Sequence, residues 1–378
     1  MKIVSLILIL CLLCSIAMTY RHHEGFVNYY KCPRLTVGDL NQKIFKKEGW
    51  NRVNKAENSD LYIPCGYTNA EVEIKTLNPS SPNQVIYSIP GCDQIVSKNR
   101  LWELLEKKWG RKTASSIMPE SYSLAVKGER DLLRTYWTRE AHKNKDGRGP
   151  VIILKKNVQQ KKGLLLTRDW SDIRFARFRG YVVAQKYLEN LYSIQGRKIN
   201  LRLYLAVKCH KNVKSFYLYN NGKCIYTSKA AGKGGGDSLD FETNITSYKL
   251  NPAIYQTHPL DLYQLKSHLT TEGLDFDQLY QRIVKIIQQT NKAVEPYLCQ
   301  QKNLADNPCF QLFGLDVIFT KSLKPYLLEC NKGPSLKPLT DGDEILKTEM
   351  LRSLYGKMGL LSDDDQIGSD PQTEWIEI

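Results

Sequence analysis

One segment in the last quarter of the chain constrains the fold more than any other. The segment Phe310–Asn331 contains two apolar runs rich in β-formers, Phe313–Phe319 and Tyr326–Cys330. The polar break Thr320–Pro325 separates them. Two such runs on either side of a short polar break predict a β-hairpin.

Oxygen-bearing side chains occur on both predicted strands of this hairpin. Asp316 lies on the first strand, and Glu329 and Asn331 lie at the end of the second. Pairing of the strands brings these side chains close together. Oxygen donors of this kind suit magnesium, which takes further ligands from water and phosphates. A buried hairpin with polar ends is the alternative, but carboxylates are seldom buried without a partner.

Length and charge bound the class of protein. The chain has 378 residues, enough for two or three packed units, and a formal net charge of +15. Residues 361–378 contain six acids and no Lys or Arg, so the remainder of the chain carries +21. A body this basic favours an acidic partner: a nucleotide, an acidic protein tail, a nucleic acid or an anionic lipid. The acidic tail itself is predicted to be flexible and solvated.

The N-terminus has the pattern of a targeting segment. Lys2 precedes the apolar run Ile3–Met18, and Ala17 offers a small-residue cleavage site. Residues 1–20 are therefore predicted to be a signal peptide or a signal-anchor, and a buried N-terminal helix is the alternative. This predicts the secretory pathway, with the protein either secreted or held at a membrane by this segment alone. A cytoplasmic location is the alternative.

The cysteine content agrees with that compartment. Ten cysteines are present, and eight lie beyond the apolar segment. An even number behind a secretory segment permits disulfides. We expect the pairs Cys299–Cys309 and Cys209–Cys224, and a reduced, buried Cys330 within the predicted site.

Apolar periodicity predicts an α/β chain. Residues 21–97 are predicted to form a small N-terminal α/β unit. The sequence Asn220-Asn221-Gly222 predicts a hairpin turn, because Asn and Gly tolerate positive φ. The remaining segments with clear patterns are predicted strands at 151–154, 164–167, 181–185, 199–209, 215–219 and 223–227, and predicted helices at 98–109, 276–298 and 343–358.

Cations on a predicted central strand indicate an anionic ligand. With period-two alternation, Lys198, Asn200, Arg202 and Tyr204 share one strand face. Two buried cations on one face are costly unless something anionic pairs with them. An exposed edge face is the alternative interpretation.

Two further segments are consistent with a nucleotide. The strand Val151–Lys155 ends in a lysine that could neutralise phosphate oxygens. The strand-to-loop segment Val182–Leu188 could hold an adenine ring between backbone and apolar groups. A solvated lysine and an ordinary core strand are the alternatives. The glycine-rich stretch Gly232–Asp237 lacks P-loop spacing and is interpreted as a surface loop.

Taken in order, these motifs resemble the tubulin–tyrosine ligase-like family of the ATP-grasp superfamily, over about residues 95–360. The resemblance is carried by Met118-Pro119-Glu120-Ser121-Tyr122, by the Gln185-Lys186-Tyr187 segment, by the strand Arg197–Tyr204, by Thr243-Asn244, and by Gly314-x-Asp316 with Leu327-x-Glu329-x-Asn331.

The resemblance implies an α/β (α+β) fold of the ATP-grasp type, with antiparallel sheets and flanking helices over residues 98–360. It also implies an ATP-dependent carboxylate–amine ligase that adds an amino acid of the tyrosine, glutamate or glycine type to a protein carboxylate through an acyl-phosphate. The implied cofactors are ATP and Mg²⁺, and the implied partners are ATP, a free amino acid and an acidic protein tail such as that of tubulin. A cytosolic partner such as tubulin fits poorly with a targeting segment.

The resemblance assigns roles to individual residues. Arg202, Lys198 and Glu329 are implied to be catalytic, and Asp316, Glu329 and Asn331 are implied metal ligands. The residues implied to bind the nucleotide are Lys98, Lys155, Gln185, Lys186, Tyr187, Leu188, Lys198, Asn200, Thr243 and Asn244.

The chain also departs from the family pattern. Lys156 replaces a usual Pro, and the glycine-rich hairpin is reduced to Gln159–Gly163. Asn200 replaces an Asp, and Ile225 replaces an Arg associated with the amino-acid substrate. These departures leave a second hypothesis open, a catalytically degenerate family member that binds a nucleotide or an acidic protein. A nucleic-acid-binding protein is suggested by charge alone, without a supporting motif.

Overall fold

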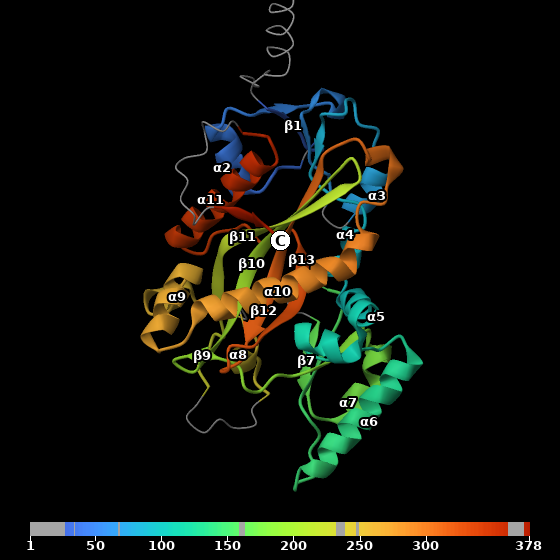
Figure 1. The fold of residues 1–378 in the computed structure, drawn as a ribbon, viewed down its shortest axis with the longest axis vertical. Coiled ribbons are helices and arrows are strands. Elements are labelled where there is room, and N and C mark those ends of the chain that lie inside the picture. Colours follow the sequence, from blue (N-terminus) through green and yellow to red (C-terminus); the bar gives the residue numbers. More distant parts are fainter. Residues whose placement is uncertain are drawn as a thin grey trace, which may run out of the picture.

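The computed structural model describes residues 27–33, 35–66, 69–158, 163–231, 239–246, 249–361 and 374–378. They form a mixed α/β fold with a ten-stranded sheet, a four-stranded sheet and helices packed on both (Figure 1). This confirms the predicted fold class. The targeting segment 1–20 and the glycine-rich loop Gly232–Asp237 lie outside the described residues.

The large sheet has the strand order β14-β11-β10-β12-β4-β3-β1-β2, with β13 paired to β12 and β9 to β10. Strand β4 of the N-terminal unit pairs in parallel with β12, so that unit shares the sheet with the rest of the fold. The strand bounds are Asn28–Tyr30 (β1), Asn51–Val53 (β2), Leu61–Tyr62 (β3), Val85–Ile86 (β4), Ser193–Ile194 (β9), Arg197–His210 (β10), Val213–Tyr226 (β11), Cys309–Phe319 (β12), Pro325–Lys332 (β13) and Trp375–Glu377 (β14).

Helices cover both faces of this sheet. Leu201, Leu203 and Leu205 of β10 belong to a core completed by α5, α9 and α10. Tyr204 and Ala206 belong to a core completed by α2 and α11. Since side chains alternate along a strand, Arg202 lies on the same side as Tyr204. The helix bounds are Asp39–Lys47 (α2), Ala70–Lys75 (α3), Cys92–Val96 (α4), Lys98–Ile117 (α5), Lys127–Lys143 (α6), Trp170–Phe175 (α7), Phe241–Asn244 (α8), Leu262–Thr271 (α9), Phe276–Val294 (α10) and Asp341–Lys357 (α11).

The starts of α5 and α10 agree with the sequence patterns, whereas the ends of both helices differ from the predicted ones. The helix predicted at 98–109 does not end there: Gly110 has φ 73° inside α5, which kinks at that residue before continuing to Ile117. Helix α10 begins after Asp275, whose carboxylate accepts the N–H of Gln278, and it ends at Val294, four residues before the predicted end. Gly359 has φ 77° just beyond the end of α11.

The hairpin predicted from Phe310–Asn331 is confirmed as β12 and β13. The register places Asp316 opposite Glu329, and Gly314 opposite Asn331. A bulge at Leu328 shifts this register, because Val317 pairs with Leu327. The extra residue lets Leu328 and Glu329, adjacent in sequence, both face the cavity described below.

The predicted turn at Asn220-Asn221-Gly222 is wrong. Strand β11 runs through it, and the turn lies instead at Lys211 and Asn212, which have φ 50° and 64°. In β11 the Asn-Asn-Gly sequence forms an irregularity opposite Leu203–Leu205 of β10. A Cβ on Gly222 would lie 2.8 Å from the Arg202 carbonyl oxygen, so close strand approach, rather than a turn, explains this glycine.

The four-stranded sheet has the order β5-β8-β6-β7. Its strands are Ser121–Ser123 (β5), Ile152–Lys155 (β6), Leu164–Thr167 (β7) and Val183–Lys186 (β8), close to the predicted strands at 151–154, 164–167 and 181–185. Helices α6 and α7 pack on one face, in the lobe at the lower right of Figure 1.

The predicted disulfide pairs are wrong. Cys209 pairs with Cys299, and Cys32 pairs with Cys65. Cys224 and Cys309, the predicted partners, are buried free thiols, as is Cys330, for which that state was predicted. Cys209 and Cys224 do lie on neighbouring strands, β10 and β11. They are not opposite each other, however, because Cys224 lies opposite Leu201.

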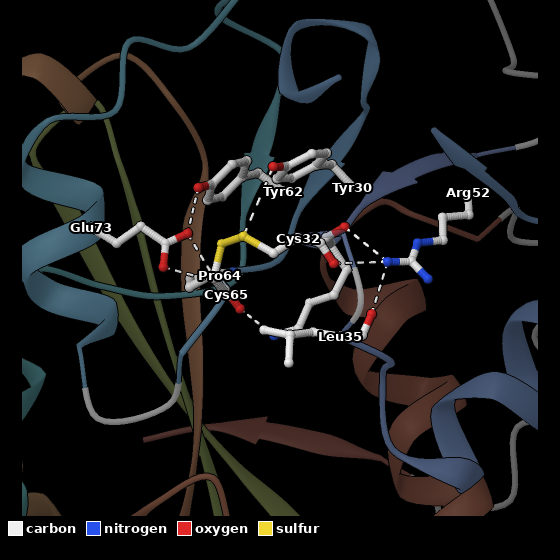
Figure 2. Close-up of a disulfide and its surroundings, with 9 residues drawn as sticks. Tyr30, Cys32, Leu35, Arg52, Tyr62, Pro64, Cys65 and Glu73 are labelled. Carbon is white, nitrogen blue, oxygen red and sulfur yellow. Dashed lines mark hydrogen bonds between the residues drawn. A yellow bond between two sulfur atoms is a disulfide. The ribbon is translucent and has the colours of Figure 1, made fainter. Parts of the chain in front are cut away.

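Backbone and side-chain contacts hold the Cys32–Cys65 disulfide in place (Figure 2). The Arg52 guanidinium donates to the carbonyl oxygens of Cys32 at 2.9 Å and Leu35 at 2.8 Å. On the other side, the Glu73 carboxylate accepts the Cys65 N–H at 2.8 Å and the Tyr62 hydroxyl at 2.5 Å. The disulfide thus joins the loops that follow β1 and β3.

The prediction of a flexible tail is wrong for its last residues. Strand β14 pairs antiparallel with β11 and forms one edge of the large sheet. The Trp375 ring is buried against Tyr219, with ring centroids 5.3 Å apart, and this apolar contact outweighs the acidic composition. Residues 362–373 lie outside the described part of the chain.

Candidate nucleotide site

A cavity of about 490 Å³ lies between the small sheet and the end of the large sheet that carries Arg202. This volume falls in the range of roughly 300–1,000 Å³ typical of small-molecule sites. The predicted site residues that line it are Lys98, Lys155, Gln185, Lys186, Tyr187, Leu188, Lys198, Asn200, Arg202, Asn244, Asp316, Glu329 and Asn331. Segments more than 200 residues apart in sequence therefore meet in one place.

A bidentate ion pair lies at the centre of the site. Arg202 Nε lies 2.7 Å from Asp316 Oδ1, and Nη2 lies 3.1 Å from Oδ2. The register makes this contact possible, because Arg202 and Asp316 are direct partners on β10 and β12. Desolvation would lower the pKa of the half-buried Arg202 guanidinium, but the charge and hydrogen bonds of Asp316 outweigh it and raise that pKa.

The second carboxylate of the predicted metal site has its own cation. Glu329 lies 3.3 Å from the Lys98 ammonium. Burial alone would raise the pKa of Glu329, but the charges of Lys98 and Lys155 outweigh it and lower that pKa to about 2. Glu329 is therefore ionised at any pH near neutrality.

The amide of Asn331 bridges the two carboxylates. Its Nδ2 donates to Asp316 Oδ2 at 3.3 Å and to Glu329 Oε1 at 3.2 Å. The two carboxylates, with the Asn331 oxygen once the amide group is turned over, would form a hard oxygen donor set that fits a magnesium ion. These residues come from both strands of the hairpin, as the sequence predicted.

Lys155 presents a buried cation to the cavity. The residue is 5% exposed, and within the described part of the chain no carboxylate oxygen lies within 4 Å of its ammonium. Burial lowers the pKa of Lys155 to about 8, with Glu329 opposing that effect. A buried lysine without an ion-pair partner is stabilised by an anionic ligand.

Lys198 is held by neutral oxygens instead. Its Nζ donates to the Tyr187 hydroxyl at 2.5 Å and to Asn244 Oδ1 at 2.6 Å. Burial lowers the pKa of Lys198. Thr243 does not line the cavity, although it was predicted to bind the nucleotide. Its hydroxyl accepts a hydrogen bond from Asn244 Nδ2 at 3.1 Å and so positions Asn244.

Two polar residues of the Gln185–Leu188 segment line the cavity and are held by contacts with the segment that contains β5. Gln185 Nε2 donates to Ser121 Oγ at 2.8 Å, and the Lys186 ammonium pairs with Glu120. The Pro119-Glu120-Ser121 motif therefore fixes the side chains of β8 that line the cavity. The sequence analysis assigned no role to this motif. The polar residues of the motif could have indicated that it holds the neighbouring apolar strand.

The apolar walls of the cavity were also missed. Ile153 and Leu164 contribute from the small sheet, and Ile318 and Leu328 contribute from the hairpin. Together with Leu188, they enclose a slot in which an aromatic ring can be held between apolar side chains.

The two departures at positions 200 and 225 are neighbours. Asn200 lies opposite Ile225 in the register of β10 and β11. Both side chains are buried, and Asn200 Oδ1 has no hydrogen-bond partner within the described residues. An uncharged cross-strand pair therefore lies where the resemblance implied an Asp and an Arg.

Comparisons with known proteins identify the family to which the chain belongs. The sequence model described as "Tubulin-tyrosine ligase family" matches residues 75–365, more than three quarters of the chain. The chain belongs to the tubulin-tyrosine ligase family. The family predicted from the motifs is therefore confirmed.

Relatives in this family share about a quarter of their aligned residues with this chain. The chain is 28% identical over 309 residues to the tubulin monoglutamylase TTLL4 of Homo sapiens, covering 77% of this chain and 25% of that protein. It is 25% identical over 354 residues to a probable beta-tubulin polyglutamylase of Tetrahymena thermophila, covering 88% and 28%. It is 26% identical over 360 residues to the probable tubulin polyglutamylase TTLL2 of Mus musculus, covering 87% and 61%. The chain thus spans about a quarter of the first two relatives.

Across residues 27–361, gaps aside, no helix combines the length and apolar character needed to cross a bilayer.

Proposed function

We propose that this chain is an ATP-dependent carboxylate–amine ligase that adds glutamate to a carboxylate of an acidic protein. The observation that carries the proposal is the convergence of Lys98, Lys155, Lys198 and Arg202 with two carboxylates in one cavity. The names of the relatives, tubulin monoglutamylase and polyglutamylase, support glutamate as the added amino acid.

The residues suit phosphoryl transfer. An acceptor carboxylate oxygen attacks the γ-phosphorus of ATP, the bond to the bridging oxygen breaks, and ADP leaves with an acyl-phosphate formed. Such a transfer depends on positioning and on cationic stabilisation. Lys155 and Arg202 supply fixed positive charge for the transferred group. A magnesium ion held by Asp316, Glu329 and Asn331 would neutralise phosphate oxygens when bound.

The second step forms the amide bond. The amino nitrogen of glutamate attacks the acyl carbon, inorganic phosphate leaves with the bonding electron pair, and the nitrogen loses a proton. No covalent enzyme nucleophile is needed. The apolar slot beside Tyr187 and Leu188 suits the adenine ring of ATP.

A second candidate is a family member that binds ATP without catalysis. The buried Asn200–Ile225 pair favours it, because the family pattern has an arginine at 225 for the amino-acid substrate. It predicts magnesium-dependent ATP binding without ADP release.

We further propose that the protein acts in an oxidising compartment. The two disulfides, Cys32–Cys65 and Cys209–Cys299, support this, because cytosolic thiols are kept reduced. The predicted targeting segment at residues 1–20 points the same way. Such a location favours an acidic acceptor other than cytosolic tubulin.

The test measures ADP release and peptide mass. The purified chain is incubated with ATP, Mg²⁺, glutamate and an acidic acceptor peptide, and the product is analysed by mass spectrometry. We expect ADP release and a mass increase of one glutamate residue, with both abolished in Arg202→Ala and Glu329→Gln. Arg179→Ala, which breaks a surface ion pair with Asp172, serves as the control. Turnover at the wild-type rate in both site variants would refute the proposed site.

A further inference from the structure

A second cavity lies on the opposite side of the small sheet from the nucleotide cavity. It has a volume of about 280 Å³ and is lined by residues of α6 and α7. These two helices lie at the lower right of Figure 1. Ile152 and Leu154 of β6 pack on this side, whereas Ile153 and Lys155 face the nucleotide cavity. Since adjacent residues of a strand point to opposite faces, the sheet separates the two cavities.

Arginines dominate the lining of this second cavity. Four of them, Arg130, Arg134, Arg174 and Arg177, accompany a single acid, Asp131. Among the residues that the structure describes, no carboxylate oxygen lies within 4 Å of any of these four guanidinium groups. Arg179, on the same segment, is paired with Asp172 at 2.6 Å. The cavity therefore keeps an excess of three positive charges that the rest of the described fold does not balance.

One of the arginines is fixed in position. Arg130 Nη1 donates to the carbonyl oxygens of Leu124 at 2.8 Å and Ala125 at 3.1 Å. These contacts use one nitrogen and leave the other N–H groups of the guanidinium for a ligand. The remaining three arginines are exposed, as expected for cations that meet their partner in solution.

Apolar groups line the cavity beneath the arginines. Leu133 of α6 and Ile173 of α7 are buried between these helices and the small sheet. The Trp170 ring packs on Trp137, with ring centroids 5.4 Å apart. The 3₁₀ turn that carries Arg177, Ala176–Arg179, also presents Phe178, whose side chain is 85% exposed. A charged rim over apolar walls suits a ligand with both methylene and anionic groups.

We propose that this cavity binds carboxylate side chains of an acidic peptide, as a second contact for the acidic acceptor protein. Guanidinium groups bind carboxylates through two parallel hydrogen bonds. Glutamate methylenes can pack on Trp170 and the leucines while the carboxylate reaches an arginine. The volume is below that of usual small-molecule sites, so the cavity accommodates one or two side chains of a longer ligand. That this ligand is the acceptor rests on the proposed function, whereas peptide binding itself does not.

The experiment measures binding without catalysis. A fluorescein-labelled peptide of ten glutamates is titrated with the full chain in the absence of ATP, and anisotropy gives the Kd. The triple variant Arg134→Gln/Arg174→Gln/Arg177→Gln should raise the Kd about tenfold or more. The matched control, Lys127→Gln/Arg139→Gln/Lys143→Gln, removes three charges from α6 outside the cavity and should raise it less than about threefold.

The outcomes are distinct. An equal loss in both triple variants would show that bulk charge alone attracts the peptide, and would overturn the cavity as a site. An oligouridylate that binds with the same dependence on these arginines, while the peptide does not bind, would overturn the proposed partner. If the cavity triple variant unfolds, Arg134→Gln and Arg177→Gln carry the test singly, each with an expected threefold effect. A chain that binds the peptide through the cavity but releases no ADP would refute the proposed function and leave this inference intact.

Discussion

Arg202 and Asp316 face each other across β10 and β12 and form two parallel hydrogen bonds of 2.7 and 3.1 Å. The pair is part of the sheet, so the position of the guanidinium depends on strand register rather than on a loop. If Asp316 turned toward a bound metal ion, the Arg202 Nε and Nη2 groups would become available to donate to a phosphoryl oxygen.

We therefore expect Arg202→Lys to lower ATP turnover even though the charge is kept. A lysine ammonium cannot form the two parallel hydrogen bonds. Loss of one charged hydrogen bond predicts a decrease of about 10- to 100-fold. The measurement is ADP release at saturating ATP, with Arg179→Lys as the surface control. Unchanged turnover would show that only the charge at this position matters.

Lys155 predicts a pH dependence of nucleotide binding. Burial lowers the pKa of Lys155 to about 8, so the charged form is lost in the free protein above that pH. The Kd for the nucleotide should rise at alkaline pH, approaching about tenfold per pH unit above pH 8. Lys155→Arg should remove this dependence, because arginine stays charged. A Kd that is flat from pH 7 to 9.5 in the wild-type protein would contradict the role of Lys155.

The same lysine predicts the sign of a stability effect. Its folded pKa lies below the ordinary value of 10.5, so between about pH 8 and 10.5 the unfolded chain binds more protons than the folded chain. The contribution of Lys155 to the free energy of unfolding therefore becomes more favourable as pH rises through this window. Urea unfolding of the wild-type protein and of Lys155→Met at pH 7.5 and pH 10 measures this contribution. The free energy of unfolding of the wild type, relative to the variant, should be higher at pH 10.

We expect substitutions at the cross-strand neighbours Asn200 and Ile225 to have coupled effects on the free energy of unfolding. Asn200→Asp alone places an added carboxylate in a buried position and should lower the free energy of unfolding by about 1–3 kcal/mol. Adding Ile225→Arg supplies a cross-strand partner and should recover part of that loss, with a coupling of about 1 kcal/mol or more. Chemical denaturation of the four proteins measures the cycle. Strictly additive losses would show that the two positions do not interact.

The cysteine pairing predicts a labelling pattern. Alkylation of the denatured, unreduced protein should modify Cys92, Cys224, Cys309 and Cys330, and leave Cys32, Cys65, Cys209 and Cys299 unmodified. Peptide mass spectrometry before and after reduction assigns each position. Labelling of Cys209 or Cys299 before reduction would rule out that disulfide, and with it part of the support for an oxidising compartment.

The sequence was most informative where one local pattern dominates. The hairpin around Asp316 and Glu329 combines β-rich runs with a polar break, and both strands and their facing carboxylates appear as predicted. The alternation in Lys198, Asn200 and Arg202 likewise indicated the correct strand face, because period two leaves little choice once a strand is assigned.

Features set by contacts between distant segments were not predictable in the same way. Asn220–Gly222 has a strong local turn signal, but pairing of β11 along β10 overrides it. The partner of Cys209 is 90 residues away, at Cys299, and no spacing rule identifies it. The bulge at Leu328, which brings Leu328 into the cavity beside Glu329, leaves no mark in the sequence. The tail shows the same limit, since Trp375 finds its contact on a strand more than 150 residues earlier.

Strand β14 has a consequence for how the chain matures. It covers Tyr217–Tyr219 in the middle of β11, whose backbone groups there would otherwise be open to any other extended chain. Until Trp375–Glu377 have been synthesised and have docked, the nascent protein displays an unpaired strand edge at Tyr217–Tyr219. Chains that end before residue 375 should therefore self-associate through it, so premature termination is a route to aggregation even when every residue of the nucleotide cavity is present.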